Sequence, residues 1–292
     1  MKGYHIYIPN YSVGADCYKE IPWVTRKYGK KAVVIGGKTA MDKVKNALLD
    51  GIDGSELEIT DFVWYGGEAS YENVEMLMET EAVKNADMIF AVGGGRVMDT
   101  CKVVRERLDK PMFTFPTLGS NCAATTSIAV IYHPDGSVNN YFYGKIPAEH
   151  IFINTKIIAE SPEHMFWAGI GDAISKELEA QLAIRGHKAD HTPLMGNQLS
   201  LICIDPLIEY GKKAYEDCKN NTESFELEQV VLDIIITTGM VSNFMTTEND
   251  YYYNSSLAHG FYNGASVIPN CIHNHQHGEI VSFGSLVLLT YD

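Results

Sequence analysis

The sequence predicts an α/β domain built on a parallel sheet, followed by an all-helical domain. Two observations favour this organisation. Up to about residue 160, short apolar segments alternate with segments of helical spacing, a pattern typical of parallel strands connected by helices. Beyond that point helical spacing dominates, and we therefore expect two domains, 1–158 and 159–292.

The first domain is expected to contain five strands separated by helices. The strands cover residues 5–9, 31–37, 56–64, 87–92 and 112–117, and the helices cover residues 17–28, 39–49, 71–84 and 97–107. Short apolar runs of this kind are typical of parallel strands that are buried on both faces. Two further strands, 128–132 and 140–143, flank the turn sequence of residues 133–137 and predict an antiparallel hairpin.

The second domain begins at a helix start signal. Ser161 is a good N-cap, Pro162 suits the first turn, and the carboxylate of Glu163 is favoured near the positive end of the helix dipole. The expected helices cover residues 172–184, 194–213, 227–245, 256–261 and 281–289.

Composition narrows the class of partner. The formal net charge is −14, with 46% hydrophobic residues, so neither nucleic acid nor an anionic membrane is an expected partner and a small molecule is favoured. No signal peptide is recognisable at the N-terminus, and the longest apolar stretch, 230–245, is shorter than the roughly 20 residues of a membrane span. The six cysteines show no C-x-x-C spacing, so we expect a cytoplasmic protein without disulfides or a thiolate zinc site.

Three consecutive glycines mark the clearest candidate binding loop. Gly93, Gly94 and Gly95 separate an expected strand from an expected helix, so unhindered backbone N–H groups and a helix N-terminus meet at one point that suits a pyrophosphate. A tight turn without a ligand is the alternative. Gly36-Gly37 and Pro116-Thr117 also end strands, and the carboxyl ends of parallel strands share one edge, so a Rossmann-like dinucleotide site is favoured.

Histidines and one aspartate are the candidates for a metal site. We expect Asp172, which follows Gly169-Ile170-Gly171, in the first turn of a helix, where dipole stabilisation alone is the alternative explanation for it. His259 and the histidines of the segment 271–279 supply imidazoles that suit a metal held by nitrogen and oxygen. Neither an H-E-x-x-H pair nor a G-x-S-x-G elbow occurs, which argues against a zincin protease and an α/β-hydrolase.

These motifs together resemble the iron-containing alcohol dehydrogenase superfamily, and its glycerol dehydrogenase branch above all. In order along the chain they are Gly93-Gly94-Gly95, Asp99-Thr100-x-Lys102, Pro116-Thr117, Gly171-Asp172-Ala173, His259 and His277-Gly278-Glu279. The resemblance implies a Rossmann-like domain that binds NAD and a helical domain, of the dehydroquinate synthase-like and glycerol dehydrogenase-like type, that holds a divalent metal in the interdomain cleft. It also leads us to expect a homo-oligomer.

The resemblance assigns roles to individual residues. The metal ligands, catalytic through the metal, are Asp172, His259 and His277. The residues expected along the cofactor are Gly37, Gly94, Gly95, Arg96, Asp99, Thr117, Ser120, Thr126, Ile128 and Tyr132. The residues expected to line the substrate are Cys122, His273 and His275.

The implied reaction is hydride transfer between a small alcohol or polyol and NAD. Removal of hydride requires the hydroxyl to become alkoxide-like, and a cation bound to that oxygen lowers its pKa and stabilises the developing charge. The protein must hold the nicotinamide over the carbinol carbon and exclude water.

The chain departs from the family pattern at several positions. Cys122 stands where the branch carries a polyol-binding Asp, so glycerol itself is not fixed as the substrate. Lys176 follows Asp172 by four positions, where the iron-binding branch has a further His, which favours zinc over iron. No acid follows the second strand at Gly37-Lys38, so NADP should be tolerated beside NAD. Family members usually continue for several further helices beyond the segment that matches residues 281–289, so either this sequence is incomplete or its helical domain is shorter than in family members.

Three alternatives to the dehydrogenase remain. A dehydroquinate synthase-like lyase and a glycerol phosphate dehydrogenase both need basic residues for an anionic substrate, and few Lys or Arg lie near 259–279. The third alternative is a non-catalytic relative that still binds nucleotide.

Overall fold

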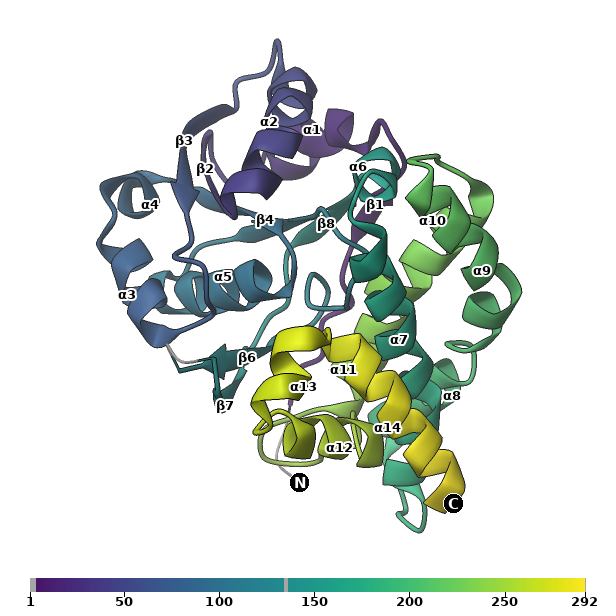
Figure 1. The fold of residues 1–292 in the computed structure, drawn as a ribbon. Coiled ribbons are helices and arrows are strands. Elements are labelled where there is room, and N and C mark those ends of the chain that lie inside the picture. Colours follow the sequence, from purple (N-terminus) through teal and green to yellow (C-terminus); the bar gives the residue numbers. More distant parts are fainter. Residues whose placement is uncertain (1–3, 134–135, 292) are drawn as a thin grey trace. The chain divides into compact units, whose positions relative to one another are not determined.

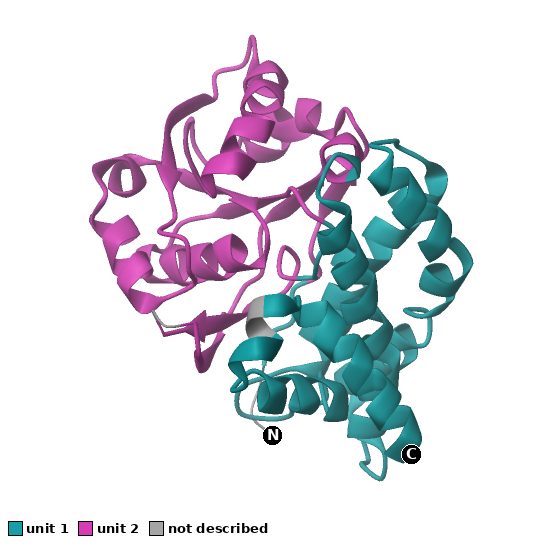
Figure 2. Ribbon diagram, in the orientation of Figure 1, with its two compact units in different colours: residues 1–7, 119–122, 159–292 teal, residues 8–118, 123–158 magenta. Residues whose placement is uncertain are grey.

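The computed structural model describes residues 4–133 and 136–291, which form two compact units (Figure 2). One unit comprises Ile8–Leu118 and Ala123–Ile158 and contains the parallel sheet. The other, which is helical, comprises Ala159–Asp292 together with Gly119–Cys122 and the described part of Met1–Tyr7. The short segment 119–122 therefore groups with the helical unit, although it precedes the boundary expected from the sequence.

The sheet has six strands in the order β1-β8-β5-β4-β2-β3, and all neighbours are parallel. The strands are β1 (Tyr11–Val13), β2 (Lys31–Gly36), β3 (Glu58–Trp64), β4 (Met88–Gly93), β5 (Met112–Pro116) and β8 (His150–Ile153). The parallel sheet followed by a helical unit confirms the predicted fold class. Every residue of β4 and β5 is buried, as expected for central strands covered on both faces.

Helices lie on both faces of this sheet (Figure 1). They are the 3₁₀ turn η1 (Cys17–Glu20), α1 (Ile21–Thr25), α2 (Lys38–Ile52), α3 (Tyr71–Glu79), α4 (Glu81–Asn85), α5 (Gly95–Leu108) and α6 (Thr155–Ala159). Figure 1 shows α1 and α2 on one face, with α3 and α5 on the other. Helices that connect parallel strands in this way place the strand ends at a common edge.

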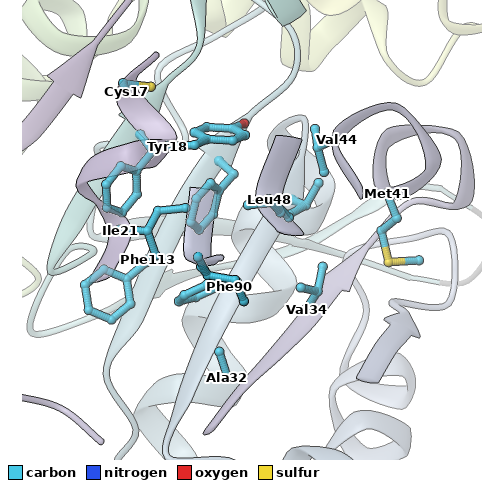
Figure 3. Close-up of a cluster of buried hydrophobic side chains, with 14 of the residues drawn as sticks. Cys17, Tyr18, Ile21, Ala32, Val34, Met41, Val44, Leu48, Phe90 and Phe113 are labelled. Carbon is cyan, nitrogen blue, oxygen red and sulfur yellow. The ribbon is translucent and has the colours of Figure 1, made fainter. Parts of the chain in front are cut away.

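Aromatic side chains form the core beneath α1 and α2 (Figure 3). Phe90 and Phe113, from neighbouring strands, meet edge to face with their ring centroids 5.8 Å apart. Leu48 of α2 and Ile21 of α1 are fully buried in the same cluster. Burial of one such side chain contributes about 1.5–3 kcal/mol, so this cluster fixes the helices on the sheet that carries the glycine loop.

The predicted hairpin is confirmed by β6 (Ile128–Tyr132) and β7 (Val138–Tyr143), which pair antiparallel. The His133 N–H donates to the Ser137 carbonyl across the turn (2.8 Å). Two residues of the predicted turn sequence, Pro134 and Asp135, lie outside the described residues.

The helical unit contains eight α-helices and one π-helical turn within the described residues. They are α7 (Glu163–Ile184), α8 (His191–Ser200), α9 (Asp205–Lys219), α10 (Phe225–Leu232), the π turn η2 (Asp233–Thr237), α11 (Thr238–Met245), α12 (Leu257–Ala265), α13 (Pro269–Asn274) and α14 (His277–Tyr291). In the described part of the chain, none of the helices combines the length and the apolar character needed to cross a membrane.

Several sequence predictions of single elements are wrong. Residues 5–9 form no strand, and the first strand is Tyr11–Val13. The helix expected over 71–84 is interrupted at Thr80, whose extended backbone ends α3 and precedes α4. The helix expected over 194–213 is two helices, because the chain breaks before Pro206, which occupies the first turn of α9.

Candidate functional site

The sequence analysis placed Asp172 in the first turn of a helix. This was wrong, because Asp172 lies in the middle of α7. Gly169 and Gly171 do not begin the helix; they let other backbone segments approach it. A Cβ on Gly169 would collide with the Gly119 carbonyl oxygen, and one on Gly171 would lie 2.7 Å from the Gly278 carbonyl oxygen. The two glycines, unfavourable inside a helix, therefore allow two other backbone segments to pack closely on α7 just before Asp172.

Three helices bring the predicted metal ligands together. Asp172 comes from α7, His259 from α12, and His277 is the first residue of α14. The Asp172 Oδ1 atom lies 3.2 Å from His277 Nε2 and 3.6 Å from His259 Nε2. One donor atom from each side chain lies within 4.8 Å of the others, and among the described residues no other group of three such side chains is this close.

The donor set fits a divalent cation. Asp172 Oδ1 is buried and has no hydrogen-bond partner among the described residues, which leaves a negative oxygen unsatisfied between two imidazole nitrogens. Burial works to raise the pKa of Asp172, but the neighbouring His277 and His259 outweigh it and hold that pKa below its usual value. One carboxylate oxygen and two imidazole nitrogens are a three-ligand set of the kind that, in catalytic zinc sites, is completed by water or substrate.

Two further charged side chains of α7 lie behind this cluster. The buried Lys176 ammonium donates to the carbonyl oxygen (3.0 Å) and the side-chain oxygen (2.8 Å) of Asn254, so it is directed away from a ligand role. Glu179, which is 0% exposed, contacts Nδ1 of His259 at 2.5 Å. The sequence analysis did not identify Glu179; its signal was the spacing 172, 176 and 179, which places three charged residues on one stripe of a helix.

The crossing of α7 and α14 depends on Gly278, the residue after His277. A Cβ at Gly278 would collide with the Ala168 carbonyl oxygen of α7. We expect Gly278→Ala to displace α14, to lower the free energy of unfolding by about 1–3 kcal/mol, and to weaken zinc binding because His277 moves from Asp172. Urea denaturation and zinc titration measure the two effects.

Gly264→Ala is the matched control for this prediction. Gly264 lies in α12, and a Cβ there would meet no atom within 4 Å. The control should therefore keep its zinc affinity and gain stability from the higher helix propensity of Ala. Equal zinc affinity in the two variants would contradict the prediction.

The two histidines expected to line the substrate differ in what the structure describes. His275 Nδ1 lies 3.1 Å from Glu279 Oε2, and the same carboxylate accepts the Gln276 N–H (3.2 Å). These contacts are those of a helix N-terminal cap at the start of α14. The side chain of His273 lies outside the described residues. Cys122 and Ser120 belong to the segment 119–122, which packs on α7 at Gly169.

The glycine loop lies in the unit that contains the sheet, at the end of β4. Gly93 ends the strand with φ of 145°, a conformation that requires glycine, Gly94 is the N-cap, and Gly95 begins α5. Gly37 is likewise the N-cap of α2. A glycine has no side chain that could cap the first backbone N–H groups of its helix. Because β2 and β4 are neighbours, these two helix N-termini share one edge of the sheet.

A buried lysine joins three of the residues expected along the cofactor. Lys102 Nζ donates to Asp99 Oδ1 (2.9 Å), Thr126 Oγ1 (2.8 Å) and the Ile128 carbonyl (2.7 Å). Asp99 Oδ2 accepts the Val130 N–H (3.1 Å). This network attaches the hairpin to α5, and the sequence analysis quoted Lys102 only as part of a motif.

The remaining residues expected along the cofactor are spread over the same unit and the 119–122 segment. Arg96 forms an ion pair with Glu68 (3.3 Å), and the Thr117 N–H donates to the Gly93 carbonyl (3.2 Å). Tyr132 ends β6.

The fold and the histidine–aspartate cluster define a class, and comparison with known proteins specifies it. The family model of iron-containing alcohol dehydrogenases matches residues 9–152. The chain belongs to the iron-containing alcohol dehydrogenase superfamily. Its relatives place it in the glycerol dehydrogenase-like branch.

Three comparisons carry this assignment. Glycerol dehydrogenase 1 of Schizosaccharomyces pombe is 29% identical over 271 residues, 91% of this chain and 57% of the relative. Glycerol dehydrogenase of Thermotoga maritima is 29% identical over 229 residues, 77% of this chain and 60% of the relative. The crystal structure of a glycerol dehydrogenase from S. pombe superposes with a TM-score of 0.87 at 28% identity, covering 100% of this chain and 73% of that one. The chain thus spans less than two thirds of the length of the two curated relatives.

Proposed function

We propose that the chain is a metal-dependent dehydrogenase that transfers hydride between a small alcohol or polyol and NAD. The observation that carries the proposal is the cluster of Asp172, His259 and His277. In this cluster the buried Asp172 Oδ1 atom has no hydrogen-bond partner among the described residues. A bound divalent cation would polarise the alcohol oxygen and stabilise the negative charge that develops on it. Asp172 would partly neutralise the cation, and the two imidazoles would supply neutral nitrogen ligands.

Zinc is the cation we propose. The three ligands leave one position of a tetrahedral site for water or substrate. Lys176, which occupies the position four residues after Asp172, is held by Asn254 and adds no ligand from α7. A set of two histidines and one carboxylate also suits ferrous iron, so the metal must be decided by experiment.

The nucleotide is proposed to bind at the sheet edge formed by the glycine loop. Backbone N–H groups at Gly94, Gly95 and the start of α2 after Gly37 suit the pyrophosphate. The Lys102 network holds Asp99, Thr126 and Ile128 in place beside this loop. Since no acid follows Gly37, we expect NADP to be accepted as well, with a preference for NAD below about a thousandfold, or roughly 4 kcal/mol.

The substrate class is proposed from the relatives. Those above are named glycerol dehydrogenases, and another, 25% identical over 293 residues, is the glycolaldehyde reductase of Halobacterium salinarum. Cys122 supplies a thiol in place of the carboxylate expected in the glycerol dehydrogenase branch, so we propose small alcohols and polyols without fixing glycerol. We also propose a cytoplasmic location and self-association. All six cysteines are free in the described residues, which is compatible with a reducing compartment.

The decisive variant is His259→Ala. It should lose bound metal and turnover and keep NAD binding, because His259 belongs to the helical unit and the glycine loop to the other. Metal analysis of the purified protein and absorbance of reduced nicotinamide, with a panel of diols, polyols and hydroxyketones, measure both effects. The control is His191→Ala, an exposed histidine on α8.

Each proposed element has its own contrary outcome. Stoichiometric metal in the His259→Ala protein would disprove the ligand assignment. Higher turnover after reconstitution with ferrous iron than with zinc would disprove the assignment of zinc as the metal. Nucleotide binding without turnover on any member of the panel would favour the non-catalytic alternative.

A further inference from the structure

We propose that Glu179 is the positioning residue of this metal site, and that it holds His259 in the ring orientation and tautomer that leave Nε2 free for the cation. The bound cation in this inference rests on the proposed function. The orientation and the tautomer of His259 rest on the contacts of Glu179. Glu179 is not among the site residues expected from the family resemblance.

The Glu179 carboxylate contacts both the ring and the backbone of His259. Its Oε2 lies 2.5 Å from His259 Nδ1. Its Oε1 accepts the His259 backbone N–H (2.8 Å) and the Ser256 backbone N–H (2.8 Å). The side chain is 0% exposed, so water does not compete for these bonds.

The backbone contacts make Glu179 the N-terminal cap of α12. Ser256 is the N-cap residue of that helix, yet its own side chain makes no cap hydrogen bond. The carboxylate from α7 takes over this role and places a negative charge at the positive end of the helix dipole. The start of α12, and with it the Cα of His259, is therefore fixed relative to α7.

The ring contact determines which nitrogen of His259 carries the proton. An ionised carboxylate accepts hydrogen bonds and does not donate, so Nδ1 must carry a hydrogen, and in the neutral ring Nε2 then keeps its lone pair. Nε2 is the atom that lies 3.6 Å from Asp172 Oδ1. Carboxylates that orient metal-bound histidines in this way commonly change metal affinity by about 10- to 100-fold when they are replaced.

The geometry of α7 supports the same assignment. Asp172 and Glu179 are seven residues apart, about two helical turns, and therefore lie on one stripe of the helix. Lys176 lies between them on this stripe and holds Asn254 (2.8 Å), which precedes α12. One stripe of α7 thus supplies a ligand, fixes the segment before α12 and orients the second ligand.

The test compares Glu179→Gln with Glu177→Gln, a neighbouring glutamate of α7. In Glu179→Gln, the new side chain can still accept the two backbone N–H groups through its amide oxygen, but its NH₂ group would donate to His259 Nδ1 and drive the proton to Nε2. Zinc competition titration should show a dissociation constant about 10- to 100-fold higher for Glu179→Gln and unchanged for Glu177→Gln. Denaturation of the metal-free proteins checks that the fold is kept.

Nitrogen-15 NMR of the histidine rings in the metal-free protein provides a second readout. At a pH where the His259 ring is neutral, it should show this ring protonated at Nδ1 in the wild type and at Nε2 in Glu179→Gln. Zinc affinity unchanged in Glu179→Gln, or a neutral wild-type His259 ring protonated at Nε2, would overturn the proposal. If the wild type binds no divalent cation, the proposed metal centre is wrong. The His259 tautomer then still tests whether Glu179 orients the ring. If Glu179→Gln does not fold, the wild-type tautomer decides.

Discussion

Replacement of Lys102 by Met should lower the free energy of unfolding by about 3–5 kcal/mol, since it removes one partner of a buried ion pair. Lys102 is 2% exposed, and its ammonium makes three hydrogen bonds, one of them to Asp99. Burial already raises the pKa of Asp99 against the opposing effect of Lys102. Without the ammonium, the Asp99 carboxylate would remain buried without its cationic partner, although it would still accept the Val130 N–H (3.1 Å), and the attachment of the hairpin to α5 would weaken.

Urea denaturation at neutral pH measures this change. The double variant Asp99→Asn, Lys102→Met should recover much of the lost stability, because a neutral amide does not carry the penalty of an unpaired buried charge. Lys145→Met is the control, since the Lys145 side chain is 86% exposed and its ion pair with Glu106 is 3.9 Å long. A loss below about 1 kcal/mol for Lys102→Met would show that the ion pair does not hold this part of the structure together.

The sequence was most informative where burial is strongest. β2, β4 and β5 were predicted because strands covered on both faces are continuous apolar runs that end at glycine or proline. β1 has three residues and β8 has four, and β8 begins with the buried His150, so neither gives a run long enough to be recognised. Their place in the sheet is fixed by pairing with each other and with β5, which local sequence does not report.

In the candidate site too, some residues could be predicted from the sequence, and the contacts of others are revealed only by the fold. Asp172, His259 and His277 were proposed as ligands from their motifs, and the structure brings them together. Gly169 and Gly171 were taken as the start of a helix, but they are positions of close approach within α7. Glu179 resembles a solvent-facing residue of an amphipathic helix until α12, eighty residues later, covers it. Lys102 is similar, since only the hairpin reveals what its ammonium contacts.

Asp233→Asn should raise the free energy of unfolding at pH 7 by up to roughly 4 kcal/mol. Asp233 begins the π-helical turn η2, is 2% exposed, and neither of its carboxyl oxygens has a hydrogen-bond partner among the described residues. Burial raises the pKa of Asp233 to about 8, and the nearby Thr237 hydroxyl opposes only part of this increase. The folded protein therefore keeps this carboxyl protonated at pH 7, whereas the unfolded chain releases the proton.

The sign of the pH dependence follows from this difference in bound protons. Between the unfolded pKa of 3.8 and the folded pKa of about 8, the unfolded state binds fewer protons, so stability falls as pH rises. Asn has no such proton. The advantage of Asp233→Asn over the wild type should therefore grow about tenfold in the unfolding equilibrium constant per pH unit from about pH 5 to 8, and level off above.

Urea denaturation at several pH values measures that advantage, and Asp217→Asn is the control. Lys213 and Ser224 outweigh the effect of burial and hold the pKa of Asp217 below its usual value, so Asp217 stays ionised in both states over this range. The stability difference between Asp217→Asn and the wild type should then be independent of pH from about 5 to 8. The same flat profile for Asp233→Asn would mean that the Asp233 carboxyl is already ionised in the folded protein, and that a partner stabilises its charge.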